Sequence, residues 1–166
     1  MSCTSTFNWS DFMPQYGYSI VQLDPDRTTL ASGRDLPVSA KDTEEVCRSI
    51  RGMRLEQAKK WLEAVMDEKQ LVTYRRHHKK HAHHATGTTR PEGGYPVKAA
   101  DAVVKVLKNA ESNAESKGLN IEKLRIIHAA AQKGRKLRKA IPRAHGRSSP
   151  YVQQLTHIEI AVEERG

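Results

Sequence analysis

Two stretches decide the fold of this chain: Leu124-Arg125-Ile126-Ile127-His128 and Thr156-His157-Ile158-Glu159-Ile160-Ala161-Val162. Both are typical of β-strands, and in the second stretch apolar residues alternate with polar or small ones, as on a half-buried strand. Between them, residues 132–155 are 24 residues with almost no core-forming side chains. Two strands with this spacing allow two arms of about 12 residues each, which reach roughly 40 Å at about 3.3 Å per residue.

The segment between these strands is strongly basic. No Asp or Glu occurs from Lys123 to Ile158. The cations in its middle are Lys133, Arg135, Lys136, Arg138, Lys139, Arg143 and Arg147. A second basic cluster consists of Arg75, Arg76, His77, His78, Lys79 and Lys80. A run of charges is often only a solvated surface, but repulsion on this scale calls for a polyanion, whose phosphates Arg and Lys would neutralise.

These cations predict a nucleic-acid-binding protein. RNA is favoured over DNA because the sequence shows no helix-turn-helix, zinc finger or basic zipper. The whole chain agrees with this class, since 28 Lys and Arg against 19 Asp and Glu give 166 residues a net charge of +9. A polyanionic partner is what such a charge implies.

Composition also excludes several other classes. No apolar run approaches the roughly 20 residues of a membrane span, and the N-terminus has neither the basic nor the apolar region of a signal peptide. Two cysteines cannot build a disulfide framework. We therefore expect a small, soluble protein of the cytosol, with no membrane partner and no homo-oligomer.

The rest of the chain predicts three helices. The first begins at the N-cap Ser39 and stops at Gly52, the second covers residues 55–66, and the third runs from Tyr95-Pro96 to Gly118. Each has apolar residues three and four apart, the period of an amphipathic helix. Residues 17–21 are a candidate short strand, ended by Asp24-Pro25-Asp26 because Asp and Pro favour turns.

Two segments lack any regular pattern. Residues 1–16 are expected to be an arm or a loose segment, which leaves residues 17–166 as a single domain. Residues 73–95 combine the second basic cluster with Gly and Thr, and we expect a long irregular insertion there, of the kind that compact domains keep mainly for function.

No catalytic group emerges from the sequence, and no cofactor is expected. Cys47 lies on the apolar stripe of the first helix and is expected to be a core thiol, and no Gly-rich phosphate-binding loop occurs. The acids lie scattered over helix surfaces. His157 and Glu159 share a face of the last strand, which is expected to be its solvent or RNA side.

A metal site is not expected at the histidine cluster either. Its members are His77, His78, His81, His83 and His84. Zinc needs about four N or S ligands on a firm frame, and a Lys-rich run without cysteine is a poor match. Contact with phosphates or bases by partly protonated rings suits these side chains better.

Several motifs together resemble a known family, the large-subunit ribosomal protein numbered twenty-two in the universal naming. The motifs are Glu45-Val46-Cys47-Arg48-Ser49-Ile50-Arg51-Gly52-Met53, Tyr95-Pro96-Val97-Lys98-Ala99-Ala100, Asn109-Ala110-Glu111-Ser112-Asn113-Ala114, Pro142-Arg143-Ala144-His145-Gly146-Arg147 and Thr156-His157-Ile158. The likeness runs from about Tyr16 to Val162. The insertion at 73–95 and the chain length are similar to the archaeal form of the family.

The resemblance implies an α+β fold, with three helices packed on a small antiparallel sheet and a long protruding β-hairpin over about 124–162. It also implies a structural protein without catalytic residues, whose body lies near the exit of the nascent-peptide tunnel and whose hairpin threads through large-subunit rRNA to line that tunnel. The partners implied are this rRNA, neighbouring large-subunit proteins and the nascent polypeptide. The hairpin tip carried over comprises Ile141, Pro142, Arg143, Ala144, His145, Gly146 and Arg147.

Two other functions remain open on the residues alone. A free-standing RNA-binding protein, such as an RNA chaperone, would have the same charge. A small hydrolase is the third class, for which the sequence offers no acid, base or nucleophile arrangement. Resistance to a moderate salt wash on the large subunit would separate a ribosomal protein from a chaperone.

Overall fold

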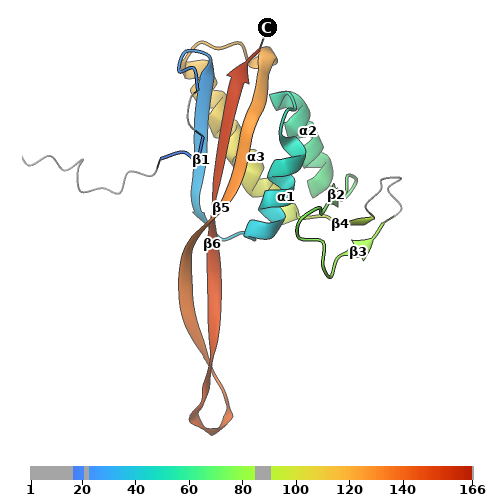
Figure 1. The fold of residues 1–166 in the computed structure, drawn as a ribbon, viewed down its shortest axis with the longest axis vertical. Coiled ribbons are helices and arrows are strands. Elements are labelled where there is room, and N and C mark those ends of the chain that lie inside the picture. Colours follow the sequence, from blue (N-terminus) through green and yellow to red (C-terminus); the bar gives the residue numbers. More distant parts are fainter. Residues whose placement is uncertain (1–16, 21–22, 85–90, 166) are drawn as a thin grey trace, which may run out of the picture.

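The computed structural model describes residues 17–20, 23–84 and 91–165, so the predicted arm at 1–16 lies outside the described residues. Its main sheet has three antiparallel strands in the order β1 (Thr28–Leu36), β6 (Ser148–Glu164) and β5 (Leu124–Pro142). Three helices pack beside this sheet, and β5 and β6 continue beyond the body as a long twisted ribbon (Figure 1).

The three helices lie where their periodicity predicts them. They are α1 (Ala40–Ile50), α2 (Leu55–Met66) and α3 (Val97–Ser116). The Ser39 hydroxyl accepts a hydrogen bond from the Asp42 N–H at 3.5 Å, which satisfies one free donor at the start of α1. With the sheet, these helices confirm the predicted α+β fold. No described helix has the length and apolar character needed to cross a membrane.

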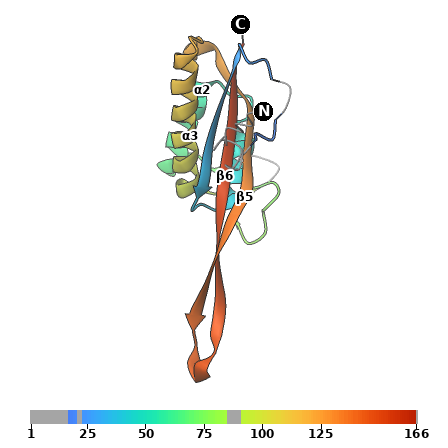
Figure 2. The same cartoon turned by 90° about the vertical axis from the view of Figure 1, so that its left-hand side faces the viewer.

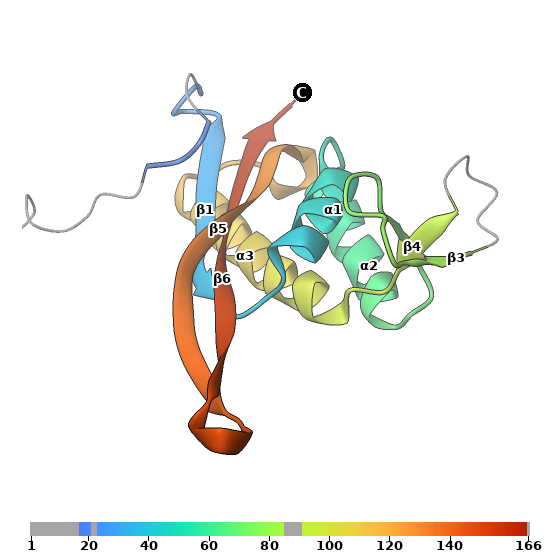
Figure 3. The same ribbon diagram turned by 60° about the horizontal axis from the view of Figure 1, so that its bottom comes forward.

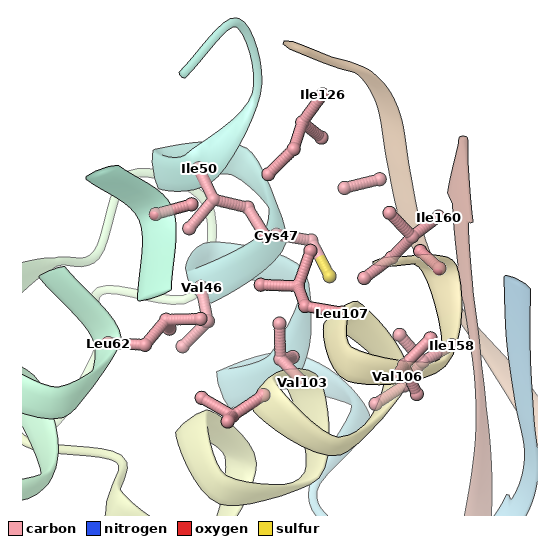
Figure 4. Packing of buried hydrophobic residues seen from close by; sticks show 14 of the residues in the cluster. Val46, Cys47, Ile50, Leu62, Val103, Val106, Leu107, Ile126, Ile158 and Ile160 are labelled. Atoms are coloured by element: carbon pink, nitrogen blue, oxygen red, sulfur yellow. The ribbon is translucent and has the colours of Figure 1, made fainter. Parts of the chain in front are cut away.

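The core lies between the helices and one face of the main sheet. The helices cover only this face of the sheet (Figure 2). Ile158, Ile160 and Val162 of β6 belong to the core and are fully buried. Cys47 of α1 and Leu107 of α3 lie in the same cluster as Ile158 and Ile160 (Figure 4). Burying each such side chain contributes about 1.5–3 kcal/mol, and the prediction that Cys47 is a core thiol is confirmed.

The local sequence pattern does not predict β1. It pairs antiparallel with β6 from Thr28↔Glu163 to Leu36↔Thr156, with a bulge after Gly33. The strand predicted at 17–21 is wrong for its described residues 17–20, which have no strand pairing. Instead the backbone N–H and the hydroxyl of Ser19 donate to Glu159 Oε2 at 2.9 and 2.8 Å.

A second, smaller sheet replaces the irregular structure expected in the insertion. Its strands lie in the order β2 (Val72–Thr73), β4 (Glu92–Gly94) and β3 (Ala82–His83), all antiparallel. Figure 3 shows this sheet beside α2, at the side of the body away from β1. Residues 85–90, between β3 and β4, lie outside the described part.

Candidate nucleic-acid interface

The ribbon formed by β5 and β6 presents its cations to solvent. Every member of the predicted set is exposed: Lys133, Arg135, Lys136, Arg138, Lys139, Arg143 and Arg147. Because residues 123–158 contain no carboxylate, these charges have no acidic neighbour along their own strands. The paired strands run from Lys136↔Gln154 to Pro142↔Ser148, so the cations lie along a narrow two-stranded support.

The tip of the ribbon is a tight turn that holds two arginines close to each other. The Arg143 N–H donates to the Arg147 carbonyl at 2.8 Å and closes the turn. His145 and Gly146 adopt left-handed φ values of 57° and 66°. The second of these is a conformation that glycine takes without steric cost, as expected from the sequence.

Three strands are tied together where the ribbon leaves the body. The Arg135 guanidinium donates from Nε and Nη2 to Asp35 Oδ2, at 3.1 and 2.6 Å. The Asp35 N–H donates to His157 Nδ1 at 3.0 Å. Asp35 belongs to β1, Arg135 to β5 and His157 to β6, so these side chains connect all three strands of the sheet at the root of the ribbon.

The root leaves no space for a larger residue at position 134. A Cβ on Gly134 would lie 2.9 Å from the His157 ring and 3.2 Å from Asp35 Oδ1. The hydrogen bond from Arg135 lowers the pKa of the Asp35 carboxyl below its usual value. Burial acts in the opposite direction but has a smaller effect. The carboxylate therefore stays charged at neutral pH and holds Arg135 in place.

The expectation that His157 and Glu159 form a solvent or RNA face is wrong. Glu159 is 2% exposed and accepts the hydrogen bonds of Ser19. His157 is only partly exposed and accepts from the Asp35 backbone. Ser19 and the end of β1 contact these two side chains, and both are distant in the sequence.

The second basic cluster is anchored to α1 by two adjacent acids. Glu44 accepts from Arg76 Nη1 at 2.8 Å and lies 3.0 Å from His77 Nε2. Glu45 is fully buried, and its Oε1 accepts from the backbone N–H groups of Arg76 and His77 at 2.7 and 3.1 Å. Glu45 thus contradicts the expectation that all the acids lie on helix surfaces.

This anchor favours the charged form of Glu45 and lowers the pKa of its carboxyl. Burial acts to raise this pKa, but the N–H donors of Arg76, His77 and Arg75, with the charge of Arg48, together bring it below its usual value. A carboxylate that accepts several backbone N–H bonds is stabilised in its charged form.

A pocket joins the two basic clusters. It measures about 220 Å³ and is lined by Ala40, Lys41, Glu44, Arg76, His77, Ala131 and Lys133. The α1 N-terminus, the insertion and β5 meet there, so residues more than 50 positions apart in the sequence contribute charge to one concave surface. The sequence predicted both clusters but gave no sign that they meet.

Other residues of the second basic cluster and of the histidine cluster fall into two groups. His78, Lys79 and Lys80 are exposed and can reach a partner. His81 stacks on Tyr74 with ring centroids 3.9 Å apart, and His84 lies edge-on to another ring. Within residues 17–20, 23–84 and 91–165, no three potential ligands cluster as they would around a metal ion.

Comparison with known proteins gives concordant matches. The family model described as Ribosomal protein L22p/L17e matches residues 31–163. The Large ribosomal subunit protein uL22 of Methanocaldococcus jannaschii is 46% identical over 144 residues, covering 87% of this chain and 92% of the relative. Those of Ignicoccus hospitalis and Thermofilum pendens are 45% and 47% identical, each covering 92% of this chain and 99% of the relative. The resemblance to the archaeal form is thereby confirmed.

Proposed function

Because this chain belongs to the ribosomal protein L22p/L17e family, a family of structural and non-enzymatic proteins, we propose that it binds large-subunit rRNA through its basic hairpin and insertion. In this proposal residues 17–166 form one ribosomal-protein domain. Its relatives are named large ribosomal subunit proteins, and we assign the chain to that subunit, in the cytoplasm.

One observation carries the proposal, namely the exposed and acid-free ribbon. Five of its seven cations lie along β5 and the other two flank the turn at the tip, while the carboxylate of Asp35 is bound to Arg135 at the root. A narrow support of this kind can enter folded RNA with phosphates on both sides. Neutralising those phosphates and releasing their counterions would drive binding.

The second contact region is the surface of the insertion. Arg75, Arg76, His78, Lys79 and Lys80 are exposed there, and His77 and Lys133 face the pocket that joins the clusters. Arg76, His77 and Lys133 line the same pocket, so the two basic clusters adjoin at the root. His77 and Arg76 keep contacts with Glu44, so we assign them a supporting part in RNA binding.

The tip has a separate role in this proposal. Residues 141–147 are all exposed. We assign them to the wall of the nascent-peptide tunnel, with Arg143 and Arg147 on rRNA phosphates, where their planar guanidinium groups form paired hydrogen bonds. The body then lies near the tunnel exit beside other large-subunit proteins, and the nascent polypeptide passes the tip.

A salt wash of ribosomes that carry the tagged chain tests this function. We expect the wild-type chain to stay with the large subunit through a moderate salt wash. A variant with Arg138, Lys139 and Arg143 replaced by Gln should be lost at lower salt. The control is Lys105→Gln, whose side chain pairs with Asp101 on α3, away from the ribbon.

Two outcomes would contradict the proposal. Loss of the wild-type chain at low salt, with recovery in the RNA-bound but ribosome-free fraction, would favour a free-standing RNA chaperone. Equal retention of the triple Gln variant and the wild type would show that the ribbon does not carry the binding.

A further inference from the structure

Exposed hydrophobic side chains concentrate on the distal ribbon. Of the six large ones found in the described residues, four belong to β5 and β6: Leu137, Ile141, Tyr151 and Val152. Tyr151 is 52% exposed and Leu137 is 42% exposed. The distal ribbon has no hydrophobic core against which these side chains could pack, so they do not stabilise the free protein. Exposed apolar patches mark interaction sites, and we therefore expect a partner to cover them.

The strand register places three of these four on one face. Tyr151 pairs with Lys139, Leu137 with Gln153 and Ile141 with Ser149. Directly opposite residues share a face, and residues two apart on one strand do so as well. Leu137 and Ile141 therefore lie diagonal to Tyr151, about 7–8 Å away between Cα atoms. We call these three residues the apolar face.

The other face of the ribbon has a different chemistry. Val152 pairs there with Arg138, and Lys136 pairs with Gln154. Two cations thus lie beside Val152, and the pair Ala140↔Pro150 follows them on this face. The apolar face instead has an aromatic ring between two aliphatic side chains and a single cation opposite the ring, Lys139. The two faces should therefore contact different parts of a partner.

We infer that the apolar face binds an unpaired RNA nucleobase, which stacks on the ring of Tyr151 while Lys139 contacts a neighbouring phosphate. This inference rests on the proposed function. An unpaired nucleotide combines a flat apolar base with an anionic phosphate, and this combination matches an exposed ring beside a lysine on an acid-free ribbon. Leu137 and Ile141 would border the base along the strand.

The choice of an RNA base over an apolar peptide follows from charge. Residues 123–158 lack carboxylates, so the partner at this face must also neutralise the cations around it. A peptide would need acidic groups at matching positions to do so. A nucleotide has one phosphate per base, so it neutralises charge wherever it stacks.

Binding of the full chain to labelled rRNA fragments tests the inference through a matched pair of substitutions. Tyr151→Leu removes the aromatic ring, and we expect it to weaken binding to a fragment with unpaired nucleotides by about 5- to 100-fold. Tyr151→Phe keeps the ring and should bind as the wild type does. Val152→Ala, on the opposite face, is the exposed control and should also bind normally.

The salt dependence distinguishes stacking from loss of charge. Tyr151→Leu should leave the slope of log K against log salt unchanged, because no phosphate contact is removed. Arg138→Gln should reduce this slope by about 0.7–0.9. For a fully paired duplex fragment, Tyr151→Leu and the wild type should bind alike.

Several results would overturn the inference. They are normal binding by Tyr151→Leu, an equal loss in Tyr151→Phe, an equal loss on the duplex, and a lowered slope for Tyr151→Leu. If any of these occurs while the wild-type chain binds with a steep salt dependence, base stacking on Tyr151 is refuted but the proposed rRNA binding is not. Absence of binding by the wild type would refute both.

Discussion

The thiol of Cys47 lies between α1, α3 and the main sheet and is 1% exposed. Burial raises its pKa to about 12. At pH 8 such a thiol has roughly a thousandth of the thiolate of an ordinary cysteine, and only the thiolate reacts with alkylating reagents. Packing alone thus makes this side chain inert.

We predict that Cys47 in a Cys3→Ser variant resists alkylation at pH 8 while the protein is folded. The same residue should react fully in guanidinium chloride. Mass spectrometry after iodoacetamide treatment measures both. Rapid labelling of the folded protein would show that the helices separate from the sheet far more often than their packing implies.

Glu45 is a second residue whose effect depends on burial. Its carboxylate satisfies two backbone donors of the insertion, and leaving buried donors unpaired costs about 1–3 kcal/mol. We expect Glu45→Ala to lower the free energy of unfolding by about that amount. Glu44→Ala removes only partly exposed ion pairs and should cost less than about 1 kcal/mol. Urea unfolding of both variants measures the difference, and equal losses would contradict this role for Glu45.

The same contact makes the free energy of unfolding depend on pH. The pKa of Glu45 is lower in the folded protein than in the unfolded chain. Its stabilisation is therefore complete above the ordinary carboxyl pKa and disappears as pH falls through the lower folded value. The difference in stability between wild type and Glu45→Ala should shrink in acid. A difference that grows as pH falls would contradict the direction of this shift.

Glu45, His157 and Glu159 also show where the sequence misleads. Helical period and strand alternation assign charged residues to the surface, and these three are largely removed from it by distant segments. The partner of Glu45 lies 31 positions away, and that of His157 lies 122 positions away. Such contacts depend on tertiary packing, which the local pattern does not contain.

At the scale of elements, prediction succeeded where apolar side chains set the period. The helices α1, α2 and α3 all have such a stripe. The strand β1 has the sequence Thr-Thr-Leu-Ala-Ser-Gly-Arg-Asp-Leu, with few apolar residues and no alternation. Its pairing with β6 makes it a strand, and the very short strands of the insertion depend on each other in the same way.

The ribbon is the element whose stability depends most on a partner. Every residue of β5 from Arg135 onward is exposed, so nothing apolar offsets the ordering cost of about 1–2 kcal/mol per residue. Repulsion among its cations adds to this cost, and an isolated two-stranded ribbon is marginal in water. We predict that the amides of residues 136–150 exchange rapidly in the free protein and slowly when rRNA is bound. Strong protection without RNA would show that the ribbon supports itself.

Removal of the ribbon tests whether the body is independent of it. We propose deleting residues 137–153 and closing the pair Lys136↔Gln154 with Asn-Gly, a turn suited to hairpins. The contacts of Asp35 at the root remain. We expect the melting temperature to change by less than about 4 °C, which corresponds to about 1 kcal/mol. A loss of cooperative unfolding would show that the ribbon holds the body together.

At the scale of the whole molecule, net charge governs association. The chain carries +9, and its densest cationic part projects from the body. If six to ten phosphates are neutralised, affinity for rRNA fragments should fall by about 10³–10⁵ between 50 and 200 mM salt on the duplex-DNA scale, and somewhat less for single strands. A titration series in increasing salt measures the slope, and a flat response would contradict electrostatic binding.

Binding of the ribbon to rRNA is tested most directly by an electron cryo-microscopy map of the large ribosomal subunit that contains this chain. We expect the map to show the ribbon of β5 and β6 inside rRNA, its cations beside phosphates, and residues 141–147 at the wall of the nascent-peptide tunnel. A map with the body on the subunit but the ribbon in solvent, or with the chain absent from the subunit, would contradict it.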